Sequence, residues 1–200
     1  LQLMRIKIKK LFFALIIAIG FNNFVLASEN LHLGNSQAKI TVKVFSSLTC
    51  PHCADFHSAV FDKLKNEFID KQIVRFEHHS FPLDLAALNA EKILRCTENK
   101  EKSFLLLNKI YKEQNKWAVG SDINKINDSI IKIGLEFKLS ENKMLNCLND
   151  EKIQDQILNA RIEAQKKYKI SSTPSIFINE KKYDGKFNYV DFKKHLNKLL

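Results

Sequence analysis

The chain has 200 residues, of which 45% are hydrophobic and 27% are charged, a size that suits one domain or one domain with a large insertion. Its formal net charge is +10 at pH 7, but the lysines are scattered along the sequence rather than gathered into a stripe. Nucleic-acid binding usually needs such a stripe, so we expect no nucleic-acid partner. The mean hydropathy of -0.22 excludes a protein with several membrane spans.

The beginning of the chain has the pattern of a secretory signal. Four basic residues within positions 5–10 precede an apolar run over residues 11–21, and a small-residue site ends at Ala27. This order is typical of a cleaved export signal, so the sequence predicts a signal peptide over residues 1–27 and a periplasmic protein. The alternative is an uncleaved membrane anchor, although a span needs about 20 apolar residues.

All four cysteines, Cys50, Cys53, Cys96 and Cys147, follow this segment. An even number of cysteines in an exported chain favours disulfide bonds. A C-x-x-C motif beside a β-α-β pattern also indicates a thioredoxin-like redox motif.

The expected elements run in the order β-α-β, a helical block, and β-β-α. Alternation with β-branched residues predicts a strand over residues 38–47, and an apolar stripe from Phe56 to Phe68 predicts an amphipathic helix after it. A second strand is expected over residues 73–81. The later helices are expected over residues 84–98, 102–117, 122–133, 141–148 and 151–168, followed by a strand over 175–179, an edge strand and a closing helix. The helical block is therefore predicted to be an insertion within one α/β unit.

The motif Cys50-Pro51-His52-Cys53 falls at the start of the first predicted helix. Pro51 suits the first helical turn, and residues three apart share a helix face, so the two sulfurs can approach for a disulfide. The helix N-terminus and His52 are expected to stabilise a thiolate at Cys50, while Cys53 lies one turn further and is more covered. A stabilised thiolate favours the dithiol, which makes the disulfide a stronger oxidant. This chemistry is disulfide donation.

The segments "TCPHC" after a strand and "STPSIFIN" after the helical block, together with the export signal, resemble the DsbA family of thioredoxin-fold thiol:disulfide oxidoreductases. The resemblance covers the chain from about Lys39 to its end. It implies an α/β, thioredoxin-like fold with an inserted helical domain. Residues 28–81 and 170–200 would form the thioredoxin-like domain, and residues 82–169 would form the insertion.

The resemblance also implies roles for individual residues. Cys50 would be the exposed nucleophile, Cys53 its buried partner, and Pro174 a cis proline beside them. Thr173 would offer its backbone to an extended substrate peptide and tune the cysteine pair. The family often carries a buried acidic residue on the strand before the motif, and the matching position here is Val44.

Partners follow from the same resemblance. Reduced or unfolded exported proteins would be the substrates, and a quinone-linked membrane protein similar to DsbB would reoxidise the cysteine pair. We expect no bound cofactor and a monomeric protein.

Cys96 and Cys147 lie in the helical block. A second disulfide occurs there in some relatives of the DsbA family, so we predict a structural disulfide between these two residues. The alternative is two free buried thiols, each of which packs as a small apolar residue.

Three other functions fit parts of the sequence. Cys50, Cys53 and His57 have helical spacing and could bind Cu(I) or Zn²⁺, as in periplasmic copper chaperones with a thioredoxin fold. No fourth ligand is evident, so we expect no metal and a partly exposed His57. A reductase of the same fold is the second alternative, although His52 argues for a lower thiolate pKa than a reductant needs. The third is a noncatalytic binding module in which the C-x-x-C is a static staple.

The remaining histidines and the single tryptophan show no catalytic pattern. His78 and His79 are expected at a strand end, as surface or packing residues, and Trp117 is expected in the core or at a helix end.

Overall fold

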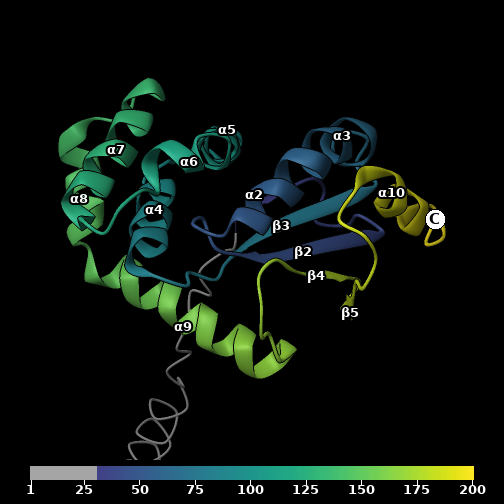
Figure 1. Cartoon of the computed structure of the whole chain (residues 1–200). Helices are drawn as coiled ribbons and strands as arrows, with labels where there is room; N and C mark the ends of the chain where they lie inside the picture. Colours follow the sequence, from purple (N-terminus) through teal and green to yellow (C-terminus); the bar gives the residue numbers. More distant parts are fainter. Residues whose placement is uncertain (1–30) are drawn as a thin grey trace, which may run out of the picture.

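The computed structural model describes residues 31–200, so the predicted signal peptide lies outside the described residues. A five-stranded sheet in the order β1-β3-β2-β4-β5 forms the centre of the described part (Figure 1). The neighbouring strands β2 and β3 run parallel, and the other neighbouring strands run antiparallel. The strands are β1 (Leu31–Leu33), β2 (Ile40–Ser46), β3 (Val74–Ser80), β4 (Ser175–Ile178) and β5 (Lys181–Lys182).

The helices fall into three groups along the chain. After β2, one helix runs through α2 (Pro51–Phe56), η1 (His57–Phe61), α3 (Asp62–Leu64) and η2 (Lys65–Ile69), in which η marks a π-helical turn. Between β3 and β4 lie α4 (Leu85–Arg95), α5 (Lys100–Lys112), α6 (Gln114–Trp117), α7 (Ile123–Glu136), α8 (Glu141–Asn149) and α9 (Glu151–Tyr168). The last helix is α10 (Tyr189–Asn197). None of the helices within residues 31–200 is long and apolar enough to cross a membrane.

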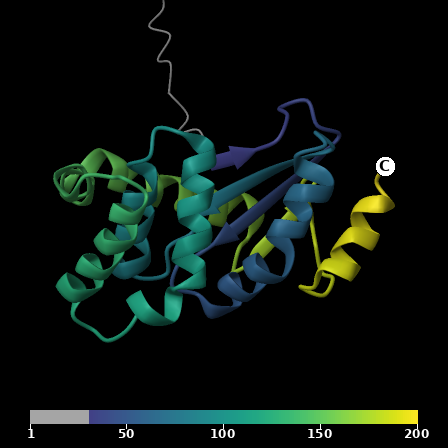
Figure 2. The same ribbon diagram turned by 90° about the horizontal axis from the view of Figure 1, so that it is seen from above.

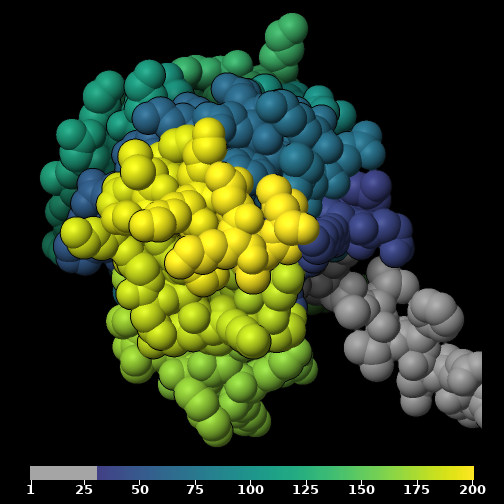
Figure 3. Space-filling view, turned by 90° about the vertical axis from the view of Figure 1, so that its right-hand side faces the viewer, coloured from purple at the N-terminus to yellow at the C-terminus, as the bar shows by residue number. Residues whose placement is uncertain are grey.

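The helices cover both faces of the sheet. In Figure 1, α2, α3 and α10 lie over one face, α9 runs across the other, and α4 to α8 gather beside one end. Figure 2 shows the helix that begins with α2 between the inserted helices and α10. The C-terminal segment lies against the residues of this central helix on the face shown in Figure 3. The last strands and helix therefore complete a unit that the first strands begin.

The apolar stripe of the central helix explains its π-helical turns. Phe56, Val60, Leu64 and Phe68 are all buried. A constant spacing of four residues would drift around an ideal helix of 3.6 residues per turn. Because a π turn winds more widely than an α turn, the turns η1 and η2 keep this stripe in the core.

Strand β3 carries its core residues on alternate positions. Val74, Phe76, His78 and Ser80 are buried, and the three residues between them are half-buried on the other face. That other face packs under α9, where a smaller core forms around Phe45, with Phe81, Ala164, Ile170 and Phe177.

The predicted elements are present with shifted ends. The helix predicted over residues 102–117 is two helices, α5 and α6, and β1 was not predicted. β1 is three residues long and gains its place by pairing with β3, which a short sequence pattern does not reveal. Trp117 is buried in the core, as predicted. The exact bounds of an inserted domain over residues 82–169 stay a prediction.

Candidate active site

The C-x-x-C motif begins the helix that follows the central strand β2. Cys50 is the N-cap of α2 with extended backbone angles, φ -79° and ψ 117°, and Pro51 occupies the first turn. The amide of Gln114, the first residue of α6, donates to the backbone oxygens of Leu48 at 2.8 Å and of Cys50 at 3.1 Å. The inserted helices therefore hold the loop that presents Cys50.

The two sulfurs have very different acidities. Both cysteines are free in this structure. A hydrogen bond from the Cys53 thiol outweighs the effect of burial and lowers the pKa of Cys50 to about 5. Thr173 and the backbone N–H groups of residues 52 and 53 lower this pKa further. Burial, and then the neighbouring Cys50, raise the pKa of the Cys53 thiol well above its ordinary value.

The two cysteines differ less in their exposed fractions than in their pKa values. Cys50 is 8% exposed and Cys53 is 2% exposed. Cys50 is therefore not the exposed residue that the resemblance implies, because the N-cap position and the Thr173 loop cover most of it.

The loop before β4 closes over Cys50. The peptide bond between Thr173 and Pro174 is cis, as predicted. The Sγ of Cys50 lies 3.4 Å from the backbone oxygen of Thr173. The hydroxyl of Thr173 is buried and has no hydrogen-bond partner of normal geometry in the described residues, so it can donate to a thiolate at Cys50. The predicted site residues of both segments therefore meet at one sulfur.

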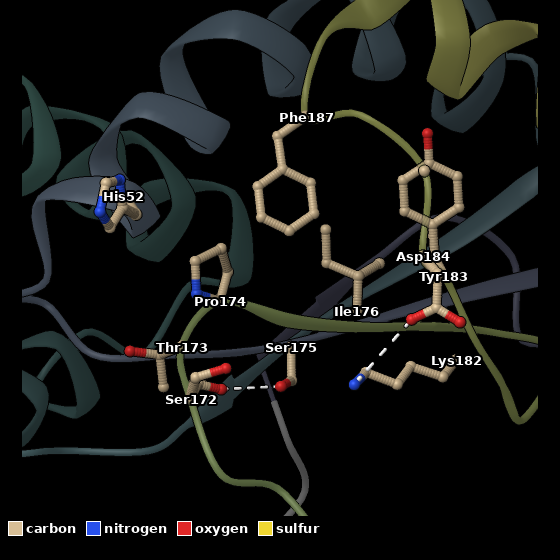
Figure 4. A pocket seen from close by; sticks show the side chains of 11 residues that line it. His52, Ser172, Thr173, Pro174, Ser175, Ile176, Lys182, Tyr183, Asp184 and Phe187 are labelled. Atoms are coloured by element: carbon tan, nitrogen blue, oxygen red, sulfur yellow. Dashed lines mark hydrogen bonds and ion pairs between the residues drawn. The ribbon is translucent and has the colours of Figure 1, made fainter.

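A pocket of about 440 Å³ adjoins this loop (Figure 4). His52 lies at one end of it, and Pro174, Ile176 and Phe187 give it an apolar side. Ser175 closes its floor with a hydrogen bond of 2.7 Å from its hydroxyl to the backbone oxygen of Ser172. The pocket therefore combines an apolar surface with a polar backbone edge next to Cys50.

His52 acts on Cys50 differently from the prediction. Its side chain is 83% exposed and lies 4.0 Å from the carboxylate of Asp55. Its effect on the pKa of Cys50 comes through its backbone N–H, at the second position of the helix. The helix start, rather than the imidazole, therefore carries the stabilisation that the sequence analysis assigned to both.

His57 is not the partly exposed residue that the sequence analysis expected. It is buried, hydrogen bonds to the side-chain oxygen of Asn108, and stacks on Phe61 with ring centroids 4.4 Å apart. Burial lowers its pKa to about 4 despite the bond to Asn108. Within residues 31–200 no group of three or more histidine, cysteine or acidic residues is arranged to hold a metal ion, so Cys50, Cys53 and His57 do not form one.

Residues 27–198 match the family model described as thioredoxin. The chain belongs to the thioredoxin family. Among solved structures, α-DsbA1 from Wolbachia pipientis is similar, with a TM-score of 0.79 and 29% identity over 86% of this chain and 91% of that one. BdbD from Bacillus subtilis in its oxidised form has a TM-score of 0.71 at 23% identity, which shows the fold alone.

Curated sequence relatives of this thioredoxin-family chain carry names that refer to disulfide chemistry. A protein of Rickettsia bellii, whose name proposes a protein-disulfide oxidoreductase, is 31% identical over 78% of this chain and 59% of its own length. The disulfide bond formation protein D of Bacillus subtilis is 28% identical over 84% of this chain and 76% of its own length. The chain thus spans less than two thirds of the rickettsial relative. These similarities confirm the predicted resemblance to the DsbA family and the thioredoxin-like fold with a helical insertion.

The second cysteine pair of this thioredoxin-family chain lies away from the first. Cys96 and Cys147 form a disulfide with their Cα atoms 6.2 Å apart, as predicted. It joins the C-terminal end of α4 to α8, across 51 positions of the sequence.

The core contains a buried polar cluster that the sequence analysis above did not predict. It consists of Ser46, His78, Ser80, Glu91 and Tyr111, all buried. One signal was visible: Glu91 stands on the apolar stripe of its helix, three residues from Leu88 and from Leu94. A charged residue in such a place is buried only with partners.

Proposed function

We propose that the chain is an exported thiol:disulfide oxidoreductase that donates the Cys50–Cys53 disulfide to reduced substrate proteins. The observation that carries this proposal is the opposite displacement of the two cysteine pKa values, to about 5 at Cys50 and upward at Cys53. A pair of this kind gives up its disulfide readily, because the dithiol form gains from a thiolate at Cys50.

The reaction conserves atoms and electrons. A substrate thiolate attacks Sγ of Cys50, the Cys50–Cys53 bond breaks, and Cys53 leaves with the electron pair and takes up a proton. A mixed disulfide then joins Cys50 to the substrate. A second substrate thiolate attacks the substrate sulfur of this bond and releases Cys50 as a thiolate. The substrate is oxidised by two electrons, and the protein is reduced by the same two.

The acidity of Cys50 supports the donating direction. Its pKa falls from 9.0 to about 5. Each pKa unit corresponds to roughly 30 mV for a two-electron couple, so the shift raises the potential by on the order of 100 mV. Pro51 and His52 serve this step by starting the helix whose N–H groups face the sulfur.

Substrate binding is assigned to the loop before β4. The backbone of Thr173 and the cis proline Pro174 would pair with an extended segment of the substrate, whose side chains would rest in the apolar pocket beside Phe187. We expect reduced exported proteins as substrates, a periplasmic location, and reoxidation by a quinone-linked membrane protein similar to DsbB. No bound cofactor takes part in the exchange.

The test is the redox potential of the Cys50–Cys53 pair, measured by equilibration with glutathione on protein whose metal content is known. A potential well above that of glutathione is expected for a disulfide donor. A potential near that of thioredoxin, about -270 mV, would assign the chain to reductases instead. Stoichiometric copper or zinc would favour the metal chaperone.

Two variants test the roles of the cysteines. Cys50→Ser is expected to abolish oxidase activity, because no sulfur is left for the substrate thiolate to attack. Cys53→Ser, mixed with a substrate that carries a disulfide, is expected to accumulate substrate adducts on Cys50, because the Cys50 thiolate attacks that disulfide and no Cys53 sulfur then displaces the substrate. The adducts appear as mixed disulfides on a non-reducing gel. Adducts on Cys53 in the Cys50→Ser variant, at the rate of the wild-type protein, would reverse the assignment.

A further inference from the structure

The turn of residues 47–50 carries Cys50 from the end of β2 to the start of α2. The backbone N–H of Cys50 donates to the oxygen of Ser47 at 3.1 Å. The oxygen of Cys50 accepts from the N–H groups of Cys53 and Ala54 at 3.1 and 3.2 Å, which begins the helix. Leu48 is 0% exposed, and its backbone oxygen takes part in none of these bonds. A buried oxygen of this kind needs a donor from another part of the chain.

That donor is the side-chain amide of Gln114. Its nitrogen lies 2.8 Å from the oxygen of Leu48 and 3.1 Å from the oxygen of Cys50. An amide nitrogen has two hydrogens, so each oxygen receives one of them. A peptide group is planar, and a bond to its oxygen therefore fixes the orientation of the whole plane. Gln114 thus fixes the planes before Thr49 and after Cys50, and the second of these sets ψ of Cys50, which is 117°.

The inserted helices give Gln114 a fixed support. Gln114 is the first residue of α6, which ends at Trp117. Trp117 is 2% exposed, and its indole N–H donates to the backbone oxygen of Ile110 in α5 at 2.8 Å. The N–H of Ala118 donates to the backbone oxygen of Gln114 at 2.9 Å. A short helix anchored by a buried tryptophan holds its first residue in one place, so the amide reaches the turn from a defined position.

The chemistry of Cys50 depends on how its backbone is oriented. The N–H groups of residues 52 and 53 act on its sulfur from the first turn of α2. The first N–H groups of a helix have no partner within the helix, so they are free to donate to a sulfur at the N-cap. Hydrogen bonds weaken steeply when the donor angle departs from linear. Cys50 is 8% exposed, so water offers little replacement for a donor that is lost.

We propose that Gln114 is a positioning residue of the redox pair, whose amide holds the Cys50 sulfur against the N–H groups that start α2. A side chain of the insertion then sets part of the oxidising strength of a motif that belongs to the thioredoxin-like unit. This inference rests on the function proposed above only in that Cys50 is the reacting sulfur. It holds for transfer of a disulfide in either direction.

The other contact between the insertion and this turn acts on side chains. The hydroxyl of Thr49 donates to the carboxylate of Asp84 at 2.7 Å and lies 3.1 Å from the hydroxyl of Ser47. A hydroxyl reaches its partners by rotation of its own side chain, which leaves the neighbouring peptide planes free to turn. Asp84 therefore holds the turn near α4, whereas Gln114 fixes the orientation of its backbone.

Two variants remove the amide without adding a charge. Gln114→Met keeps the length of the side chain and deletes both N–H donors. Gln114→Ala deletes the whole side chain and lets water reach the oxygen of Leu48. The matched control is Gln154→Met, the same substitution at another half-buried glutamine. Gln154 lies in α9, and its side-chain oxygen accepts from Nζ of Lys92 at 3.4 Å, so the control also loses a hydrogen bond of the insertion.

The experiment measures the acidity and the potential of the pair in the full chain. The rate at which iodoacetamide alkylates Cys50 in the reduced protein is followed against pH, and mass spectrometry confirms a single alkylation at this residue. The midpoint of the rate profile is the pKa of Cys50. Equilibration with glutathione gives the redox potential of the pair. Urea unfolding of the oxidised and reduced forms shows that each variant is folded and gives its free energy of unfolding.

The wild-type midpoint is expected at about 5. In Gln114→Met and Gln114→Ala it is expected to rise by about one pH unit, a tenfold weaker preference for the thiolate, and the potential to fall by roughly 30 mV. The alkylation rate well above the midpoint is expected to rise by about threefold, because a more basic thiolate is the better nucleophile. Gln154→Met should keep the wild-type midpoint and potential.

Two outcomes would overturn the proposal. One is a lower free energy of unfolding in both redox forms with the wild-type midpoint and potential, which a purely structural role of Gln114 would give. The other is an equal shift of the midpoint in Gln154→Met, which would make the effect one of general destabilisation. If Gln114→Met does not fold, Gln114→Ala decides by the same measurements. A wild-type Cys50 with the acidity of an ordinary thiol would instead contradict the proposed function itself.

Discussion

The sulfur of Cys50 receives its hydrogen-bond donors from two distant parts of the chain. The start of α2 supplies the Cys53 thiol and two backbone N–H groups, and Thr173, more than 120 positions further along, brings a hydroxyl that can donate to the thiolate. These donors favour the thiolate over the thiol, which is why its pKa lies so far below that of Cys53.

Titration of the reduced protein is expected to show a thiolate at Cys50 with a midpoint of about 5. Since this pKa lies below the unfolded value of 9.0, the thiolate stabilises the reduced fold fully above about pH 9 and not at all below about pH 5. The free energy of unfolding of the reduced form, minus that of the oxidised form, should therefore rise between these limits. Thiolate absorbance and urea unfolding of both forms measure this. A difference in the free energy of unfolding that does not change with pH would contradict the assignment. His57 and the other groups that titrate in both forms contribute equally to each and cancel in this difference.

Removing one donor should shift the same equilibrium. Thr173→Val keeps the shape of the side chain but deletes its hydroxyl, so the pKa of Cys50 is expected to rise and the redox potential to fall by roughly 30 mV per pKa unit. Thr173→Ser keeps the hydroxyl and should stay close to wild type. Equal potentials in the two variants would show that the hydroxyl does not act on the thiolate.

At the scale of elements, the inserted helices hold the active-site loop in place. Asp84 caps α4 by accepting from the backbone N–H of Ala87 at 2.7 Å. Its other carboxylate oxygen accepts from the hydroxyl of Thr49 at 2.7 Å, one residue before Cys50. One side chain therefore starts a helix of the insertion and ties it to the redox motif.

Asp84→Ala is expected to lower the free energy of unfolding by about 1 to 2 kcal/mol, because the N-cap and the bond to Thr49 are both lost. Asp84→Asn keeps a capping oxygen and should lose less than half as much. Chemical unfolding of the three oxidised proteins gives the comparison. Equal stability of Asp84→Ala and wild type would show that the α4 start holds without this cap.

The helix after β2 shows where sequence patterns reach their limit. The stripe from Phe56 to Phe68 predicts one buried face, and that face is present. His57 and Phe61 form a second buried face, because α5 packs there and brings Phe104 onto Phe61 with ring centroids 5.6 Å apart. The contact with Phe104 comes from a helix about 40 positions further along the chain, so the periodicity of the helix after β2 cannot predict it.

At the scale of the whole molecule, features that a short segment forms by itself could be predicted from the sequence. Features that need two distant segments to meet could not. The C-x-x-C and the proline before β4 are local motifs, and their chemistry depends on helix starts and strand starts that short segments determine. The cluster around His78 and Glu91 is different, since β3 and α4 meet only in the folded chain. Gln114 and Asp84 likewise reach the redox motif across the insertion.

The disulfide between Cys96 and Cys147 stabilises this insertion. It closes a loop of 51 positions, which the chain-entropy model values at about 4 kcal/mol. The double variant Cys96→Ala/Cys147→Ala is expected to lose an amount of this order and to melt at a lower temperature. The glutathione potential of Cys50–Cys53 should be unchanged, since none of the donors to Cys50 lies at this disulfide. A shifted potential with unchanged melting would contradict both expectations.

The place of β4 beside β2 has a consequence for a chain that is still being made. β2 pairs with β4, whose residues come after the whole insertion. Until residues 173–178 emerge, one edge of β2 is unpaired and Cys50 lacks the Thr173 loop. The nascent chain therefore carries three of its donors to Cys50 but not the fourth, at a time when Cys96 and Cys147 are already available as competing thiols. The final acidity of Cys50 is thus set last, by residues that follow the whole insertion.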